Sequence, residues 1–225
     1  MTECVYSYNC NHADCEKPFC EKKFRLDFLY DKSLLSEHQR KKVELMTDAD
    51  GTDLKPFQFL AYVSENIEQF VEEGRNLYIY SANCGNGKTS WSVRLLQAYL
   101  NKIWWKSALN CRVLFISVPK FLLATKENIT QKSEYLEKVL EGLKTADLVV
   151  WDDIAAKVGT EWEVSQLLSL IDNRLILGKS NIFTSNLDSQ EIAKALGDRL
   201  ASRICQMSQA VPFYGADKRQ FTFNN

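Results

Sequence analysis

Hydrophobic residues in the middle of the chain recur at the spacing of one helical face. The periodic positions between residues 56 and 73 are Phe57, Leu60, Val63, Ile67, Phe70 and Val71. Pro56 suits the first helical position, where its missing N–H would have no partner anyway. Gly74 follows the last apolar position, so we expect one amphipathic helix that ends there.

After this helix the pattern changes to short apolar runs separated by helical periodicity. The runs predicted as strands are residues 76–81 (NLYIYS), 112–118 (RVLFISV), 147–151 (DLVVW), 181–185 (NIFTS) and a short segment near 211–214. The segments predicted as helices are 88–104, 130–145, 162–177 and a stretch of the last forty residues. Strands without polar alternation, each followed by a helix, are typical of a parallel sheet covered on both faces. The fold class is therefore α/β.

The chain divides into two expected parts. Residues 47–55 are polar, contain Gly51 and precede Pro56, so they are interpreted as a linker. The predicted domains are a small unit over residues 1–50 and a larger one over 51–225. A length of 225 residues, 45% of them apolar and 25% charged, suits one soluble α/β domain with an appendage. We see no membrane span and no secretory signal, so the expected location is cytoplasmic and no membrane partner is expected.

Net charge and cysteine usage refine this picture. A formal charge of −1 argues against a protein that coats duplex DNA by bulk electrostatics, although a local nucleic-acid path stays possible. Four of the seven cysteines fall in the first twenty residues. In a reducing compartment, clustered cysteines hold metal more often than they form disulfides.

A glycine-rich turn between a predicted strand and a predicted helix suggests phosphate binding. Residues 82–89, ANCGNGKT, match G-x-x-x-x-G-K-[ST] with Ala82 in place of the first glycine. A helix N-terminus and inward-facing N–H groups attract phosphate, Lys88 would reach the β- and γ-phosphates, and Thr89 would bind Mg²⁺. A chance glycine turn is the alternative. The expected ligands are ATP or ADP with Mg²⁺, contacted by Asn83, Cys84, Gly85, Asn86, Gly87, Lys88, Thr89 and Ser90.

Two later strand ends carry polar residues that fit the same chemistry. Asp152 would hold Mg²⁺ together with Thr89, and Asp153 would orient the attacking water. Residues 184–186, taken alone, would be interpreted as a helix cap. Because they follow the phosphate loop and the acid pair in order, Asn186 is instead expected to contact the γ-phosphate or the water.

Arginines near the C-terminus are candidates for stabilising phosphoryl charge. Arg199 and Arg203 lie four residues apart on one predicted helical face, and Arg219 follows the last strand. The planar guanidinium suits a finger that reaches a neighbouring molecule's nucleotide. Taken alone, these arginines would be interpreted as a solvated face or as intrachain ion pairs.

Taken together, these motifs resemble the AAA+ helicase loaders of the DnaC/DnaI type, including phage-encoded members. The similar segments occur in family order over residues 57–225: NLYIYSANCGNGKTS, DLVVWDDIA, SNIFTSNLD, LGDRLASRI and GADKR. The resemblance implies an AAA+ P-loop NTPase domain that hydrolyses ATP and associates with copies of itself through the ATP site. It implies Walker A at Lys88 and Thr89, Walker B at Asp152 and Asp153, sensor 1 at Asn186, an arginine finger at Arg203 with Arg199 competing, and sensor 2 at Arg219. Asp153 stands where many members have glutamate, which puts efficient hydrolysis in doubt.

The resemblance also gives the N-terminal unit a role. Loaders of this type pair a helicase-binding unit with the ATPase, and in some that unit binds zinc. We predict a Cys-rich, mainly helical unit whose Zn²⁺ ligands are Cys4, Cys10, Cys15 and Cys20, with Cys4 ahead of His12 as the fourth. The spacing lacks C-x2-C, so a metal-free helical unit remains the alternative.

The implied function is ATP-dependent loading of a replicative hexameric helicase onto single-stranded DNA in the initiation of DNA replication. Residues 118–126 occupy the position expected to face the DNA, with Lys120 and Lys126 toward phosphates. Phe121 is interpreted as a core residue rather than a stacking platform. The alternatives are a transposition helper ATPase of the IstB type, which shares these motifs, and a monomeric P-loop kinase.

Overall fold

A five-stranded parallel sheet forms the centre of the molecule. The computed structural model describes residues 6, 10, 19–43, 45, 51–128 and 132–218. The strands are β1 (Asn76–Tyr80), β2 (Val113–Ser117), β3 (Leu148–Asp152), β4 (Ser180–Ser185) and β5 (Gln209–Pro212). They lie in the order β2-β3-β4-β1-β5, and every neighbouring pair is parallel. The parallel sheet predicted from the apolar runs is confirmed.

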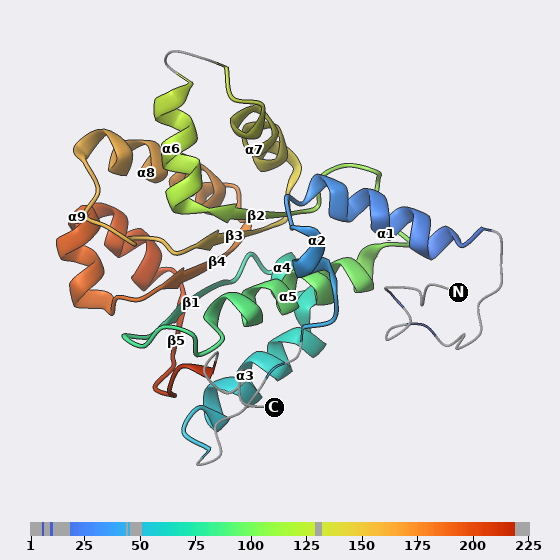
Figure 1. The fold of residues 1–225 in the computed structure, drawn as a ribbon, viewed down its shortest axis with the longest axis horizontal. Helices are drawn as coiled ribbons and strands as arrows, with labels where there is room; N and C mark the ends of the chain where they lie inside the picture. The colour runs from blue at the N-terminus through green and yellow to red at the C-terminus, as the bar shows by residue number, and fades with distance from the viewer. Residues whose placement is uncertain are drawn as a thin grey trace.

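Helices cover both faces of this sheet. They are α1 (Glu21–Lys32), α2 (Glu37–Arg40), α3 (Leu54–Glu65), α4 (Ile67–Glu72), α5 (Lys88–Ile103), α6 (Val118–Glu127), α7 (Glu134–Thr145), α8 (Glu161–Ile176) and α9 (Ser189–Gln206). In Figure 1, α6 to α9 lie on one side of the strands, and α1, α3, α4 and α5 lie on the other. The molecule therefore has three layers.

Each strand contributes side chains to two separate cores. Along β1, Leu77 and Ile79 pack with α1, α3, α4 and α5, whereas Tyr78 packs with the helices of the opposite face. On β3, Val150 belongs to the first core and Trp151 to the second, and both are fully buried. Successive side chains of a strand point to opposite faces, so a strand buried on both faces needs a continuous apolar run.

Two predicted helical features are wrong in detail. The helix expected over residues 56–73 is two helices, α3 and α4, because the backbone leaves the helical region at Asn66 (φ −107°, ψ 24°). Pro56 is the third residue of α3 and not the first. The third N–H of a helix also lacks an intrahelical acceptor, so proline is tolerated there. Residues 118–127, which we expected to follow a strand without assigning them a structure, form α6.

The described part of residues 1–50 packs on the larger domain. Leu26, Leu29 and Tyr30 of α1 are fully buried and share one core with α3, α4 and α5. The Gln97 side chain of α5 also donates hydrogen bonds to the carbonyls of Gln39 and Lys41, at 2.8 Å each. The domain boundary at residue 50 stays a prediction. The contacts just described join the two predicted parts.

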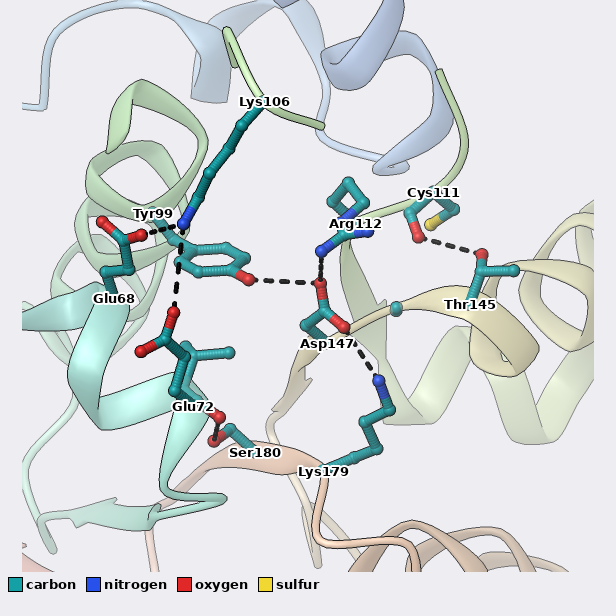
Figure 2. Close-up of polar contacts among 12 residues, drawn as sticks. Glu68, Glu72, Tyr99, Lys106, Cys111, Arg112, Thr145, Asp147, Lys179 and Ser180 are labelled. Carbon is teal, nitrogen blue, oxygen red and sulfur yellow. Dashed lines mark hydrogen bonds and ion pairs between the residues drawn. The ribbon is translucent and has the colours of Figure 1, made fainter. Parts of the chain in front are cut away.

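A polar network closes the edge of the sheet where β3 begins. Asp147 accepts hydrogen bonds from the Tyr99 hydroxyl at 3.1 Å and from Lys179 Nζ at 2.8 Å, and it pairs with Arg112 at 2.5 Å. Figure 2 shows these side chains converging on the one carboxylate from α5 and from the segments that precede β2 and β4. Since Asp147 precedes β3 and Asp152 ends it, this network lies at the edge opposite Asp152. Among the described helices, none is long and apolar enough to cross a bilayer.

Candidate functional site

The loop between β1 and α5 places a lysine beside backbone that only glycine adopts easily. Gly85 and Gly87 have φ of 70° and 101°, in the left-handed region that a Cβ makes costly. Gly87 directly precedes α5, so the unpartnered N–H groups of that helix start open toward the loop. Lys88 Nζ donates to the Asn83 carbonyl at 2.8 Å and to Asn86 Oδ1 at 3.3 Å. The loop is therefore built as an anion site at a helix N-terminus.

Oxygen atoms from three elements meet beside this loop. The Thr89 hydroxyl of α5 donates to Asp152 Oδ1 at 2.9 Å, and the Thr184 hydroxyl of β4 donates to the same oxygen at 2.7 Å. Because β3 and β4 are parallel neighbours, their carboxyl ends lie at one edge of the sheet. A hydroxyl and a carboxylate are ligands that suit Mg²⁺, so Thr89 and Asp152 fit the predicted metal site.

The environment of Asp152 favours its protonated form. The pKa of this carboxyl is raised to about 6, mainly by burial and less by the nearby Asp153 carboxylate, while the hydrogen bonds from Thr184 and Thr89 and the charge of Lys88 oppose the shift. A cation at this position would offset the burial and favour the ionised form.

The second acid sits on a strained turn held by β4. Asp153 has φ 54° and Ala155 has φ 64°, both unusual for residues with a Cβ. The turn is fastened because Asp153 N–H donates to the Thr184 hydroxyl and Ile154 N–H donates to the Thr184 carbonyl, at 2.9 Å each. This role of Thr184 was not predicted from the amino-acid sequence. Its one signal was a polar residue near the end of an apolar strand.

One cavity collects most of the predicted site residues. It is lined by Cys84, Gly85, Asn86, Gly87, Lys88, Thr89, Ser90, Asp153 and Asn186. Asn83, also predicted to contact nucleotide, does not line this cavity, and its side chain contacts the segment after β5. Asp152 adjoins the cavity through Thr89. Residues from the segments that follow β1, β3 and β4 are thereby brought within reach of one ligand.

The two predicted arginines that the structure describes, Arg199 and Arg203, do not line this cavity. Arg203 Nε pairs with Asp172 of α8 at 2.8 Å, and Arg199 is exposed on the same segment of α9. That segment begins at a kink, since Gly197 has φ 77° and ψ 156° inside α9. Arg219 lies outside the described residues. Its neighbour Lys218 is beside the loop, with its N–H donating to the Gly85 carbonyl at 3.1 Å.

The predicted DNA-facing stretch is a helix with paired lysines. Lys120 Nζ lies 4.3 Å from the centre of the Tyr135 ring, and Lys126 pairs with Glu163 at 3.0 Å. Phe121 is 1% exposed, which confirms its interpretation as a core residue. Either lysine would exchange an intrachain partner for a phosphate on binding DNA.

The structure places two of the four predicted zinc ligands. Cys10 and Cys20 are half-buried, and Cys20 Sγ accepts a hydrogen bond from Lys23 N–H at the start of α1. Cys4 and Cys15 lie outside the described residues. In the described part of the chain no three potential ligands gather into a metal-binding group. The zinc set therefore stays a prediction.

A phosphate loop after β1 and two acids at the carboxyl end of β3, with β4 between these parallel strands, define a P-loop NTPase, and this fold is that of an AAA+ domain. The model of the bacterial DnaA ATPase domain matches residues 56–209, well over half of the chain. The chain therefore belongs to this family of AAA+ ATPases.

Within that class, the chain is similar to two replicative helicase loaders. It is 27% identical to DnaC of Escherichia coli strain K12 over 139 residues, which are 60% of this chain and 54% of DnaC. It is 26% identical to DnaI of Bacillus subtilis strain 168 over 147 residues, 64% of this chain and 43% of DnaI. The chain spans about half the length of these curated relatives. The resemblance predicted from the motifs is confirmed.

Solved structures share the fold at lower identity. The crystal structure of the DnaC helicase loader superposes with a TM-score of 0.64 at 19% identity, covering 80% of this chain and 100% of that one. AMPPCP-bound DnaA from Aquifex aeolicus gives a TM-score of 0.55 at 22% identity, covering 78% of this chain and 50% of that one. These matches show the AAA+ architecture.

Proposed function

We propose that this chain is an ATP-dependent loader of a replicative DNA helicase onto single-stranded DNA. The observation that carries the proposal is the cavity at the ends of β1, β3 and β4, where Lys88 and the Thr89–Asp152 pair adjoin Asp153 and Asn186. The similarity to DnaC and DnaI, both named as replicative helicase loaders, supports the specific role.

In this proposal each side chain has a distinct task. The phosphate loop and Lys88 bind the triphosphate, and Thr89 and Asp152 hold Mg²⁺, which neutralises phosphate charge when bound. Asp153 orients and polarises the attacking water, because its strained turn holds its carboxylate at the cavity. Asn186 lines the same cavity and donates its amide toward the γ-phosphate or the water. The reaction is hydrolysis of ATP to ADP and phosphate.

Hydrolysis is completed by a neighbouring copy. Arg203 lies on the last helix, half-exposed and paired with Asp172, so its guanidinium is held at the surface rather than at its own cavity. A finger supplied in trans needs this placement, since it stabilises the phosphoryl charge of another subunit. Arg219 would act as the sensor 2 arginine from the segment after Lys218. Self-association through the ATP site follows from these roles.

The remaining surfaces would serve the partners. Helix α6 presents Lys120 and Lys126 to the phosphates of single-stranded DNA. Residues 1–50 would bind the hexameric helicase, with Cys4, Cys10, Cys15 and Cys20 holding zinc in the part that precedes α1.

Nucleotide binding is tested by a pair of lysine variants on one helix. Lys88→Ala removes the side chain at the phosphate loop, and Lys102→Ala removes one from the last turn of α5. We expect Lys88→Ala to lose at least about tenfold in Mg²⁺–ATP affinity by calorimetry, as a buried charge partner of phosphate is worth more than about 1.4 kcal/mol. Lys102→Ala should bind like the wild type. Wild-type protein without affinity for ATP or ADP would overturn the whole proposal.

Loading is tested with purified components. The replicative helicase of the source cell, circular single-stranded DNA and ATP are mixed with wild-type or Lys88→Ala protein, and DNA-bound helicase is measured by co-sedimentation. We expect the wild type to increase bound helicase severalfold and Lys88→Ala to add little. Capture of a transposase and not of helicase from source cells would favour a transposition helper instead.

A further inference from the structure

The segment after β5 runs along the phosphate loop as a strap, defined as residues 213–218. Phe213 N–H donates to the Tyr80 carbonyl at 2.8 Å, which continues the β1–β5 pairing past its last strand pair. The Asn83 side-chain amide then donates to the carbonyls of Tyr214 and Gly215, at 3.1 Å each. Lys218 N–H donates to the Gly85 carbonyl at 3.1 Å. The strap therefore contacts the loop along its length (its red segment lies beside α3 in Figure 1).

The buried carboxylate of Asp53 also binds this strap, through hydrogen bonds to its backbone. Asp53 is 1% exposed, and its two oxygens accept the N–H groups of Tyr214 at 2.7 Å and Gly215 at 3.0 Å. Asp53 is also the residue that precedes α3, where an aspartate ordinarily caps its own helix. It makes no such side-chain cap. Its carboxylate is committed to the strap and not to α3.

Aromatic packing fixes the geometry of this contact. Phe57 of α3 lies 5.2 Å from the Phe213 ring and 5.3 Å from the Trp91 ring, measured between centroids. At the end of the strap, Lys218 Nζ lies 4.3 Å from the centre of the same Phe57 ring. Trp91 belongs to α5, the helix that the phosphate loop opens. The strap, the start of α3 and the start of α5 thus form one packed unit.

The strap reaches the phosphate-binding lysine through one residue. The Asn83 side chain donates hydrogen bonds to the strap, and the Asn83 backbone carbonyl accepts a hydrogen bond from the Lys88 ammonium at 2.8 Å. A loop that is not held must be ordered when ligand binds, and the ordering entropy lowers affinity. A fixed Asn83 and Gly85 avoid that cost.

We propose that Asp53 is a positioning residue for nucleoside triphosphate binding: it fastens the strap and thereby holds the phosphate loop in its binding conformation. The inference rests on the proposed function, because it assumes that the loop binds a nucleotide. Asp53 touches no phosphate itself. It acts through Tyr214 and Gly215 on Asn83.

The test compares variants that loosen the strap with one that loosens a distant carboxylate site. Asp53→Ala removes both acceptors, and Asp53→Asn keeps one. Asp147→Ala removes a carboxylate with three partners at the opposite edge of the sheet. Mg²⁺–ATP affinity is measured by calorimetry on full-length protein whose fold is checked by circular dichroism, and exchange of the Tyr214 and Gly215 amide protons is followed by mass spectrometry.

We expect Asp53→Ala to weaken ATP binding about tenfold and to speed exchange in the strap, and Asp53→Asn to give about a threefold loss. Asp147→Ala should lower the melting temperature while its ATP affinity stays within twofold of wild type. If Asp53→Ala does not fold, Asp53→Asn and Asn83→Ala replace it in the test. The losses of ATP affinity in these two variants should not add in the double variant, because both release the same strap.

Two results would overturn the inference. One is wild-type ATP affinity in a folded Asp53 variant, and the other is an equal loss in Asp147→Ala, which would reduce the effect to general destabilisation. Both require that wild-type protein binds ATP. Absence of binding in the wild type would instead remove the proposed function itself.

Discussion

At the scale of single residues, the site depends on where carboxylates are placed and on what surrounds them. Asp152 is buried between Thr89 and Thr184, whereas Asp153, the next residue, turns into the open cavity. Consecutive acids thus acquire different chemistry from their surroundings. The first is suited to hold a metal and the second to orient water.

The raised pKa of Asp152 predicts a pH-dependent affinity for Mg²⁺–ATP. Its folded pKa of about 6 means that the carboxyl is ionised above that pH and must lose a proton to bind Mg²⁺ below it. We expect Mg²⁺-dependent ATP affinity to fall about tenfold between pH 7.5 and pH 5. Calorimetry over this range, with EDTA and with Asp152→Asn as controls, separates this effect from protonation of ATP. An equal pH dependence in all three series would contradict the prediction.

Glu163 predicts a second pH effect, on stability. It accepts hydrogen bonds from the Thr160 backbone N–H and the Thr160 hydroxyl and pairs with Lys126 and Lys157. The backbone hydrogen bond contributes most to lowering its pKa to about 2. A carboxyl with a lowered folded pKa stabilises the protein above its unfolded pKa, and this contribution is lost as the pH falls from about 4.5 toward 2. We expect Glu163→Gln to lower the free energy of unfolding by about 1–3 kcal/mol at pH 7.

The neighbouring Glu161 provides the matched control. It is exposed in the first turn of the same helix, so Glu161→Gln should change stability by less than about 0.5 kcal/mol. Urea denaturation at pH 7 and pH 3 measures both variants. A Glu163→Gln deficit of the same size at both pH values would show that the ionised carboxylate is not the cause.

At the scale of elements, periodicity located the helices and strands, and local backbone geometry set their ends. The apolar spacing over residues 57–71 continues through Asn66, but the chain turns there, so that α3 packs on α5 whereas α4 packs on both α5 and β4. A helical pattern records which side chains are buried and not whether the axis is straight. Helix α6 was not predicted over residues 118–127 for a different reason, because Pro119 and the short apolar run at residues 121–124 gave no clear period.

Gly74 between α4 and β1 gives a prediction at this scale. Its φ is +64°, and an added Cβ would lie 2.5 Å from the Gly178 carbonyl oxygen, whereas Gly178 has φ +63° with open space around a Cβ. We expect Gly74→Ala to cost about 3 kcal/mol of stability, from strain and a backbone clash, and Gly178→Ala about 1 kcal/mol, from strain alone. Chemical denaturation measures both. Equal losses of unfolding free energy in the two variants would mean that the backbone moves at Gly74 and relieves the clash.

At the scale of the whole molecule, a finger supplied by a neighbour predicts complementation between two defective proteins. Lys88→Ala protein keeps Arg203, and Arg203→Ala protein keeps the phosphate loop, so only a mixture can assemble complete sites. We expect each variant alone to hydrolyse ATP at least about tenfold more slowly than wild type. An equal mixture should recover about a quarter of the wild-type rate, because random pairing completes about one interface in four.

Arg199→Ala is the control for this experiment, since it removes the competing arginine from the same segment of α9. Steady-state phosphate release measures all variants and mixtures. Wild-type activity in pure Arg203→Ala protein would exclude Arg203 as the finger, and the same experiment would assign the role to Arg199 if that variant is the inactive one.

The amino-acid sequence by itself determined the α/β class, the order of the described strands along the chain, most of the helices of the larger domain, and the motif residues from Asn83 to Ser90 with Asp152, Asp153 and Asn186. These are properties of neighbouring residues, because periodicity, glycine content and strand-end acids are local. Only the tertiary structure decided that Thr184 holds Asp152, that Arg203 pairs with Asp172, and that Asp53 fastens a strap 161 residues further along the chain. Those contacts join segments whose meeting depends on how the layers pack, and no local pattern of residues encodes it.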